Sequence, residues 1–136
     1  MTPFLARLNS SRRTLSYASA GHVPGLIFLD SGDVKCKLES AGPPLGIFPT
    51  SKFSLQQAVD LDAGEIAVFL TDGVIQSTTP NRHQFGCQRV LDQIPSLSRE
   101  SASNIANGIC YATGEFAQGD LQDDDITSMI IKANHF

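Results

Sequence analysis

Apolar segments separated by short polar stretches predict strands along the first part of the chain. Four of these segments form two consecutive pairs, Phe4–Leu8 with Thr14–Ala20 and Leu26–Leu29 with Val34–Leu38. The polar stretch inside each pair is suited to a hairpin loop. In the second loop Gly32 can supply the positive φ that a tight turn needs. The sequence therefore predicts two successive hairpins.

Two further strands are expected before residue 80. In the segment Phe53–Val59, the side chains of Phe53, Leu55 and Val59 share one face, which is typical of a half-buried strand. After a turn at Asp62-Ala63-Gly64 comes Ile66–Leu70, an unbroken apolar run too short for a typical helix. Such a run suits a strand that is covered on both faces.

The apolar period then changes from that of strands to that of a helix. Cys87, Val90, Leu91 and Ile94 have the i, i+3, i+4, i+7 spacing of one helical face, and Pro95 is expected to stop this helix.

A second helix is predicted from about Arg99 to Thr113, with Ser98 as N-cap and Gly114 as its end. Its inner face is expected to consist of Ala102, Ile105, Ala106, Ile109 and Cys110. A final strand is predicted at Ile126–Lys132. Strands, two helices and a last strand, with no internal repeat or interdomain linker, indicate one α+β domain over residues 1–136. Its helices would cover one face of a largely antiparallel sheet.

Composition narrows the class of protein. The 136 residues carry a net charge of −4, with no long run of one sign for nucleic acid to bind. No apolar stretch approaches the roughly 20 residues of a membrane span, and arginines interrupt the start of the chain where a signal peptide would be apolar. We therefore expect a globular, cytoplasmic protein. The cysteines Cys36, Cys87 and Cys110 are odd in number and widely spaced, which favours reduced, packed thiols over disulfides or zinc.

Carboxylates gather beside two of the predicted strands. Asp72 directly follows the strand Ile66–Leu70, and the acidic stretch Asp120–Asp125 directly precedes the last strand. If these strands pair antiparallel, Asp72 approaches Asp124. Two carboxylates about 5 Å apart repel by several kcal/mol, so they need a cation or a shared proton. Oxygen ligands with no nearby His or Cys favour Mg²⁺, Mn²⁺ or Ca²⁺. Acidic loop ends and Asp-Gly turns are also common at solvated surfaces. The pair of aspartates alone is therefore compatible with a metal site and with a solvated turn.

Six short motifs appear in a recognisable order. They are Ser19-Ala20-Gly21-His22-Val23-Pro24, Gly42-Pro43-Pro44-Leu45-Gly46, Leu61-Asp62-Ala63-Gly64-Glu65, Phe69-Leu70-Thr71-Asp72-Gly73-Val74, Phe85-Gly86 and Asp124-Asp125-Ile126-Thr127. In this order the chain resembles, over nearly its whole length, the C-terminal part of the bacterial, SpoIIE-like branch of the metal-dependent (PPM) protein serine/threonine phosphatases.

The resemblance implies an α/β-β/α sandwich holding two or more Mg²⁺ or Mn²⁺ ions, at which a metal-bound water attacks phosphoserine or phosphothreonine. Carried over by position, Asp72 and Asp124 match the metal-binding aspartates of this half of the domain. Asp123 and Asp125 are expected to be turn residues. His22 lies in a different motif from the family's metal-adjacent histidine, so a structural role near the cleft is expected.

The family's N-terminal acidic motifs, including the aspartate that bridges both ions, have no counterpart in this sequence. We therefore expect a partial domain with little phosphatase activity on its own, weak or absent metal binding, and self-association through exposed sheet surface. The resemblance implies a phosphorylated regulatory protein, of the anti-sigma-factor antagonist type, as substrate in bacterial stress signalling.

Two other functions remain open. One is a pseudophosphatase module that binds a regulatory protein without turnover. The other is a Ca²⁺-binding or purely structural domain, which the lack of an alternating D-x-D-x-D-G pattern in Asp120–Asp125 disfavours.

Overall fold

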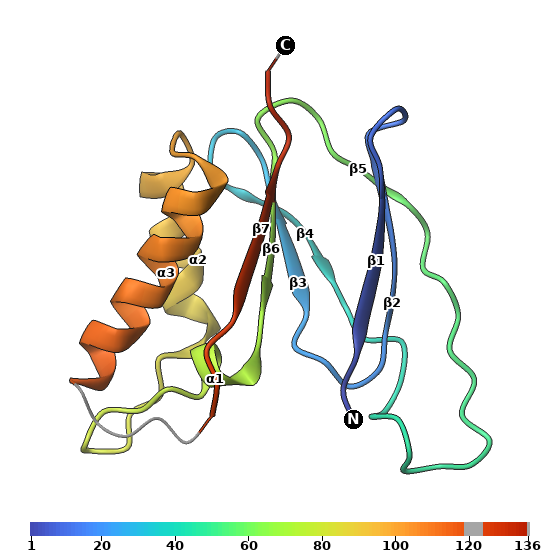
Figure 1. Ribbon diagram of the computed structural model, residues 1–136, viewed down its shortest axis with the longest axis horizontal. Coiled ribbons are helices and arrows are strands. Elements are labelled where there is room, and N and C mark those ends of the chain that lie inside the picture. Colours follow the sequence, from blue (N-terminus) through green and yellow to red (C-terminus); the bar gives the residue numbers. More distant parts are fainter. Residues whose placement is uncertain (119–123, 136) are drawn as a thin grey trace.

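The described residues form two antiparallel sheets and one layer of helices (Figure 1). The structure is a computed structural model that describes residues 1–118 and 124–135. The first sheet contains β1 (Phe4–Asn9), β2 (Thr14–Ser19) and the short β5 (Val59–Asp60), in the order β1-β2-β5. The predicted first hairpin is confirmed, since β1 and β2 pair antiparallel along their full length.

The second sheet has the order β4-β3-β6-β7. Its strands are β3 (Gly25–Phe28), β4 (Val34–Leu38), β6 (Ile66–Leu70) and β7 (Ser128–Lys132). All neighbouring strands are antiparallel. The second predicted hairpin is confirmed, and Gly32 adopts φ +91° in its turn.

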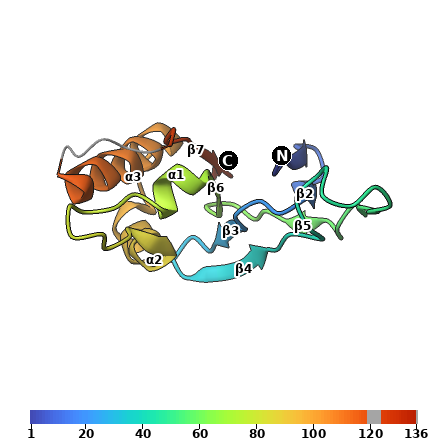
Figure 2. The same cartoon turned by 90° about the horizontal axis from the view of Figure 1, so that it is seen from below.

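The helices α1 (Asp72–Ile75), α2 (Gly86–Leu97) and α3 (Ala102–Ala117) cover one face of the second sheet, as Figure 2 shows from below. The opposite face of that sheet looks toward the first sheet. Alternate residues of β6 enter the two cores: Ile66, Val68 and Leu70 pack under the helices, and Ala67 and Phe69 pack toward β2. All five residues of β6 are buried, as the unbroken apolar run predicts. The α+β fold class is thereby confirmed.

The predicted strand Phe53–Val59 is wrong. Only Val59–Asp60 forms a strand, and the preceding segment is irregular. Leu55, expected on the buried face, is 63% exposed. Before β5, one backbone hydrogen bond ties the segment to the first sheet, from the Gln56 N–H to the Tyr17 carbonyl (2.7 Å). Apolar alternation without a paired ladder did not produce a strand here.

The helix ends also differ from the prediction. Pro95 does not stop α2: it lies inside the last turn of the helix, which continues to Leu97. The N-cap of α3 is Ser101, not Ser98, and its side chain accepts a hydrogen bond from the Asn104 N–H (3.1 Å). Gly114 does not end α3, which runs on to Ala117.

The inner face of α3 is correctly predicted at Ile105 and Ile109, which are fully buried. Thr113 and Ala117 extend this face for about two more turns. The three cysteines are free and half-buried.

Candidate metal site

The pairing of β6 with β7 brings the two acidic segments together. The strands are antiparallel, and Leu70 at the end of β6 lies opposite Ser128 at the start of β7. Thr71 and Asp72 therefore leave β6 beside Asp124–Thr127, which lead into β7. The antiparallel pairing expected from the sequence is confirmed.

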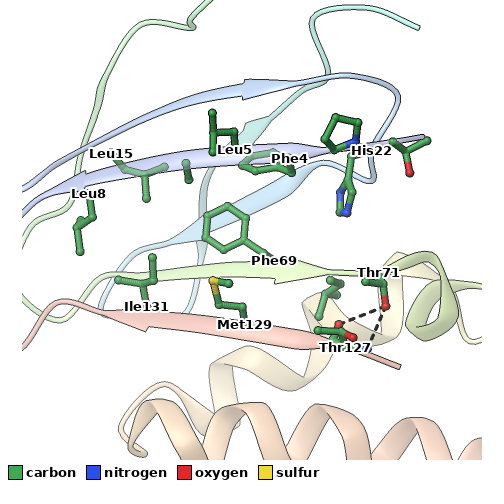
Figure 3. Close-up of a pocket in the computed structure, with 14 residues that line it drawn as sticks. Phe4, Leu5, Leu8, Leu15, His22, Phe69, Thr71, Thr127, Met129 and Ile131 are labelled. Atoms are coloured by element: carbon green, nitrogen blue, oxygen red, sulfur yellow. Dashed lines mark hydrogen bonds between the residues drawn. The ribbon is translucent and has the colours of Figure 1, made fainter. Parts of the chain in front are cut away.

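Thr71 joins the two segments through its backbone and its side chain. Its N–H donates to the carbonyl oxygen of Thr127 (3.1 Å), and the Thr127 N–H donates back to Thr71 Oγ1 (3.0 Å). The Thr71 hydroxyl in turn donates to the carbonyl oxygen of Asp125 (3.1 Å). Figure 3 shows Thr71 and Thr127 meeting at the end of these strands.

Gly73 allows an unusually close approach of the acidic segment. A Cβ atom at this position would collide with the carbonyl oxygen of Asp125 and lie 3.2 Å from that of Asp124. The turn after β6 and the chain at Asp124–Asp125 are therefore in direct backbone contact.

The two predicted ligands sit on either side of this contact. Asp72 is the first residue of α1 and is half-buried. Asp124 is exposed, and its Oδ1 accepts a hydrogen bond from the Asp125 N–H (2.8 Å). Asp125 is exposed and contributes its main-chain carbonyl to the contact. Asp123 lies outside the described residues.

Carboxylate and carbonyl oxygens are the donors that Mg²⁺ and Mn²⁺ prefer, so the residue types at this junction fit such an ion. Within residues 1–118 and 124–135, however, no group of three or more His, Cys, Asp or Glu side chains is placed to hold a metal. Asp72 and Asp124 would form part of a ligand set.

His22 lies across from this junction, beside the first sheet (Figure 3). Its Nδ1 is 2.9 Å from the Val23 carbonyl oxygen, and its ring packs edge-on against Phe4 at 5.8 Å between centroids. These contacts are those of a residue that shapes a turn. His83 and His135 are exposed.

An apolar groove of about 520 Å³ runs between the two sheets and ends at Thr71 and Thr127. Its walls include Phe4 and Leu5 from β1, with Phe69 from β6 and Met129 from β7 (Figure 3). Both flanking strands, β1 and β7, are terminal in the sheets of the described residues. The groove is not among the features predicted from the sequence, although the apolar residues of Phe4–Leu8 are a signal for it.

An ion pair between the half-buried Lys35 and the buried Glu65 fixes the turn that leads into β6. Glu65 Oε2 accepts hydrogen bonds from Lys35 Nζ (2.7 Å) and from the Asp62 N–H (3.0 Å). Burial lowers the pKa of Lys35, but the hydrogen bond and charge of Glu65 outweigh it, and the pKa lies above its ordinary value. This pair holds the start of β6, whose other end carries Thr71 and Asp72.

Comparison with known proteins assigns the family. Residues 1–134 match the family described as Stage II sporulation protein E (SpoIIE). The chain belongs to this family, a bacterial branch of the PPM-type phosphatases, and the resemblance drawn from its motifs is confirmed.

Two curated relatives are similar along nearly the whole chain. Phosphoserine phosphatase RsbU of Bacillus subtilis is 33% identical over 139 residues, covering 97% of this chain and 38% of RsbU. Protein IcfG of Synechocystis is 32% identical over 133 residues, covering 98% of this chain and 20% of IcfG. The chain thus spans less than two-fifths of the length of either relative.

Solved structures share the fold at lower sequence identity. The SiaA-PP2C domain of Pseudomonas aeruginosa matches with a TM-score of 0.83 at 22% identity, over 98% of this chain and 52% of that one. A SpoIIE structure from Bacillus subtilis, with the PP2C phosphatase domain and a regulatory fragment, matches with a TM-score of 0.81 at 18% identity, over 99% of this chain and 39% of that one. RsbX in complex with magnesium matches with a TM-score of 0.62 at 16% identity, over 95% of this chain and 54% of that one.

These likenesses place the present fold within the PP2C phosphatase fold. In the described part of the chain, no helix has the length and apolar character needed to cross a membrane.

Proposed function

We propose that this chain is the C-terminal part of a metal-dependent phosphatase domain that hydrolyses phosphoserine or phosphothreonine on a regulatory protein of bacterial signalling. Family membership and the relative named phosphoserine phosphatase RsbU support the reaction class. The observation that carries the proposal for these residues is the contact between the Asp72 turn and the Asp124 segment, at the paired ends of β6 and β7.

In this proposal Asp72 and Asp124 bind Mg²⁺ or Mn²⁺. A divalent ion of this kind, when bound, lowers the pKa of a water ligand and neutralises phosphoryl oxygens. The residues of this chain supply two of the anionic ligands. The β6–β7 register holds these ligands where the end of β6 meets the start of β7. The solved structures of RsbX in complex with magnesium and of Mn-presoaked SpoIIE are consistent with either ion.

Two carboxylates are few for a hard divalent cation, which takes about six oxygen ligands. We therefore propose that the chain by itself binds the ion weakly and turns over phosphoprotein slowly or not at all. Additional carboxylates from outside these residues would complete the site.

The proposed partner is a phosphorylated regulatory protein of the anti-sigma-factor antagonist type, met in the cytoplasm. One matched structure is described as the RsbU and RsbW domains of a single Mycobacterium tuberculosis protein, which supports a place in such regulatory systems. Self-association is part of the proposal, because β1 and β7 leave apolar residues exposed beside the groove.

A Mn²⁺ titration tests the metal site. Paramagnetic broadening of backbone amide NMR signals should centre on Asp72–Gly73 and Asp124–Thr127. Asp72→Asn and Asp124→Asn should each raise the Mn²⁺ concentration at half-maximal broadening at least tenfold. Asp92→Asn is the matched control, since Asp92 is exposed on α2 and receives a hydrogen bond from Gln88 there. Broadening that is equal in all four proteins would reject the assignment.

Catalysis needs its own assay, with a phosphoserine peptide and Mn²⁺. Rapid hydrolysis by the chain would contradict the proposal that its metal site is incomplete. Tight peptide binding without turnover, even after extra carboxylate-bearing sequence from the same gene is restored, would favour a pseudophosphatase module.

A further inference from the structure

We propose that Thr71 is a positioning residue whose hydroxyl sets the separation of the Asp72 and Asp124 carboxylates. The inference rests on the proposed metal site and names a residue that acts on the ligands without being one. It starts from the side chain of Thr71, which spans two chain segments 54 to 56 residues apart in sequence.

The hydroxyl of Thr71 acts as both acceptor and donor. It accepts the Thr127 N–H at 3.0 Å and donates its proton to the Asp125 carbonyl oxygen at 3.1 Å. A hydroxyl has one proton and two lone pairs, so one side chain can satisfy both groups at once. The chain at Asp125–Thr127 is thus held at each end by the same oxygen atom.

The backbone of Thr71 adds a third bond, from its N–H to the Thr127 carbonyl oxygen (3.1 Å). That bond belongs to the backbone, so its donor is kept in both Thr71→Val and Thr71→Ser. The side-chain bond to Asp125 differs in kind, because it lies beyond the β6–β7 ladder and fixes the residue next to Asp124. Without the hydroxyl, the described hydrogen bond that remains between Thr71 and this segment is the one to the Thr127 carbonyl oxygen. Packing of Ile126 against the core and of Gly73 against Asp125 remains, but neither replaces the directed bond to the residue next to Asp124.

Position matters here because a metal ligand must be held to within about half an ångström of its working geometry. Loss of a hydrogen bond that orients a ligand typically weakens metal binding 10- to 100-fold. Asp124 and Thr127 are exposed, so water can replace the lost bonds. The expected consequence of losing the hydroxyl is a misplaced segment, with little change in overall folding.

Thr71→Val and Thr71→Ser separate the hydroxyl from the shape of the side chain. Valine keeps the β-branch and removes the hydroxyl, whereas serine keeps the hydroxyl. We expect Thr71→Val to raise the Mn²⁺ concentration at half-maximal NMR broadening about tenfold and Thr71→Ser to restore it. Thr14→Val is the matched control, since Thr14 lies in β2 at the far end of the first sheet, paired with Asp60.

Hydrogen exchange of the Thr127 amide gives a readout that does not need metal. Its N–H should exchange faster in Thr71→Val than in the wild type and Thr71→Ser, because its acceptor is gone. Unchanged exchange in Thr71→Val would overturn the inference whatever the metal does. Faster exchange with unchanged Mn²⁺ binding would also overturn it, while leaving the metal site intact.

A wild-type chain that shows no localised Mn²⁺ broadening would reject the proposed metal site itself, and with it a positioning role for Thr71. The exchange measurement would still report whether the hydroxyl holds the segment. The failures of the two proposals are therefore distinguishable.

Discussion

Gly73 and the carbonyl oxygen of Asp125 lie so close together that no Cβ atom fits between them. The atoms that Gly73 approaches belong to the main chain of Asp125. The hydroxyl of Thr71, 54 residues earlier in the sequence, holds the Asp125 carbonyl oxygen in place. Gly73 has no positive φ, so its role is to leave space rather than to adopt an unusual conformation. This contact directly joins the turn of Asp72 to the segment of Asp124.

Gly73→Ala should therefore displace the acidic segment. We expect a loss of about 1–3 kcal/mol in the free energy of unfolding, the usual cost of inserting a methyl group into a packed contact, together with weaker Mn²⁺ broadening at Asp124. Urea denaturation and the Mn²⁺ titration measure the two effects. Unchanged stability and unchanged broadening together would show that the two segments are not in contact in solution.

Gly114→Ala is the control for Gly73→Ala, because it adds the same methyl group at a position with no neighbouring atoms. Gly114 lies inside α3, and a Cβ there would meet no atom within 4 Å. Alanine should stabilise the chain by about 0.5–1 kcal/mol, because it favours the helix more than glycine does. A destabilised Gly114→Ala in the same urea experiment would mean that α3 ends before this residue in solution.

Ser101→Ala tests the observed start of α3. Removing the side chain that accepts the Asn104 N–H should cost about 0.5–2 kcal/mol. Thermal unfolding followed by circular dichroism measures the change. Ser103→Ala, on the exposed side of the same first turn, should change stability much less. An equal loss from both substitutions would argue against Ser101 as the N-cap.

Alkaline pH should destabilise the chain through three groups. Burial raises the pKa of Cys36 above its ordinary 9.0 and that of Tyr17 above 10.0. The hydrogen bond to Glu65, after offsetting the effect of burial, raises the pKa of Lys35 above 10.5. A raised folded-state pKa contributes stability that is fully present below the unfolded value and is lost as pH rises through the folded value.

The free energy of unfolding should therefore fall as pH rises above about 9, beginning with Cys36. Cys36→Ala should flatten the earliest part of this decline. Urea denaturation at a series of pH values from 7 to 11 checks the direction, with Cys87→Ala as control. Stability that rises over this range would contradict the raised pKa values of these groups.

Self-association should depend on the two strands beside the groove. Leu5 on β1 and Met129 on β7 are 72% and 59% exposed, and charged residues on such strands oppose pairing between copies. Light scattering should show a concentration-dependent increase in mass that Leu5→Lys and Met129→Lys reduce. Tyr111→Lys on α3, also an exposed large residue at 70%, should leave it unchanged. A wild-type monomer at all concentrations would reject self-association.

Local patterns in the sequence were sufficient for most of the fold. The two hairpins and the buried strand Ile66–Leu70 were predicted because turn residues and unbroken apolar runs act over a few neighbouring positions. The periodic apolar residues of α2 and α3 were predicted for the same reason. The errors fell at Phe53–Val59 and at the helix ends predicted from Pro95, Ser98 and Gly114, where short-range signals alone did not fix the boundary.

For the candidate site, the sequence by itself determined the acidic residues, their motif order and the family, since these are properties of residue type and spacing. Tertiary structure decided how the two segments meet. The β6–β7 register places Leu70 opposite Ser128, the Thr71 hydroxyl holds Asp125, and Gly73 gives room for that contact. Each is a contact between residues more than 50 positions apart, and no local pattern specifies such a contact before the sheet has formed.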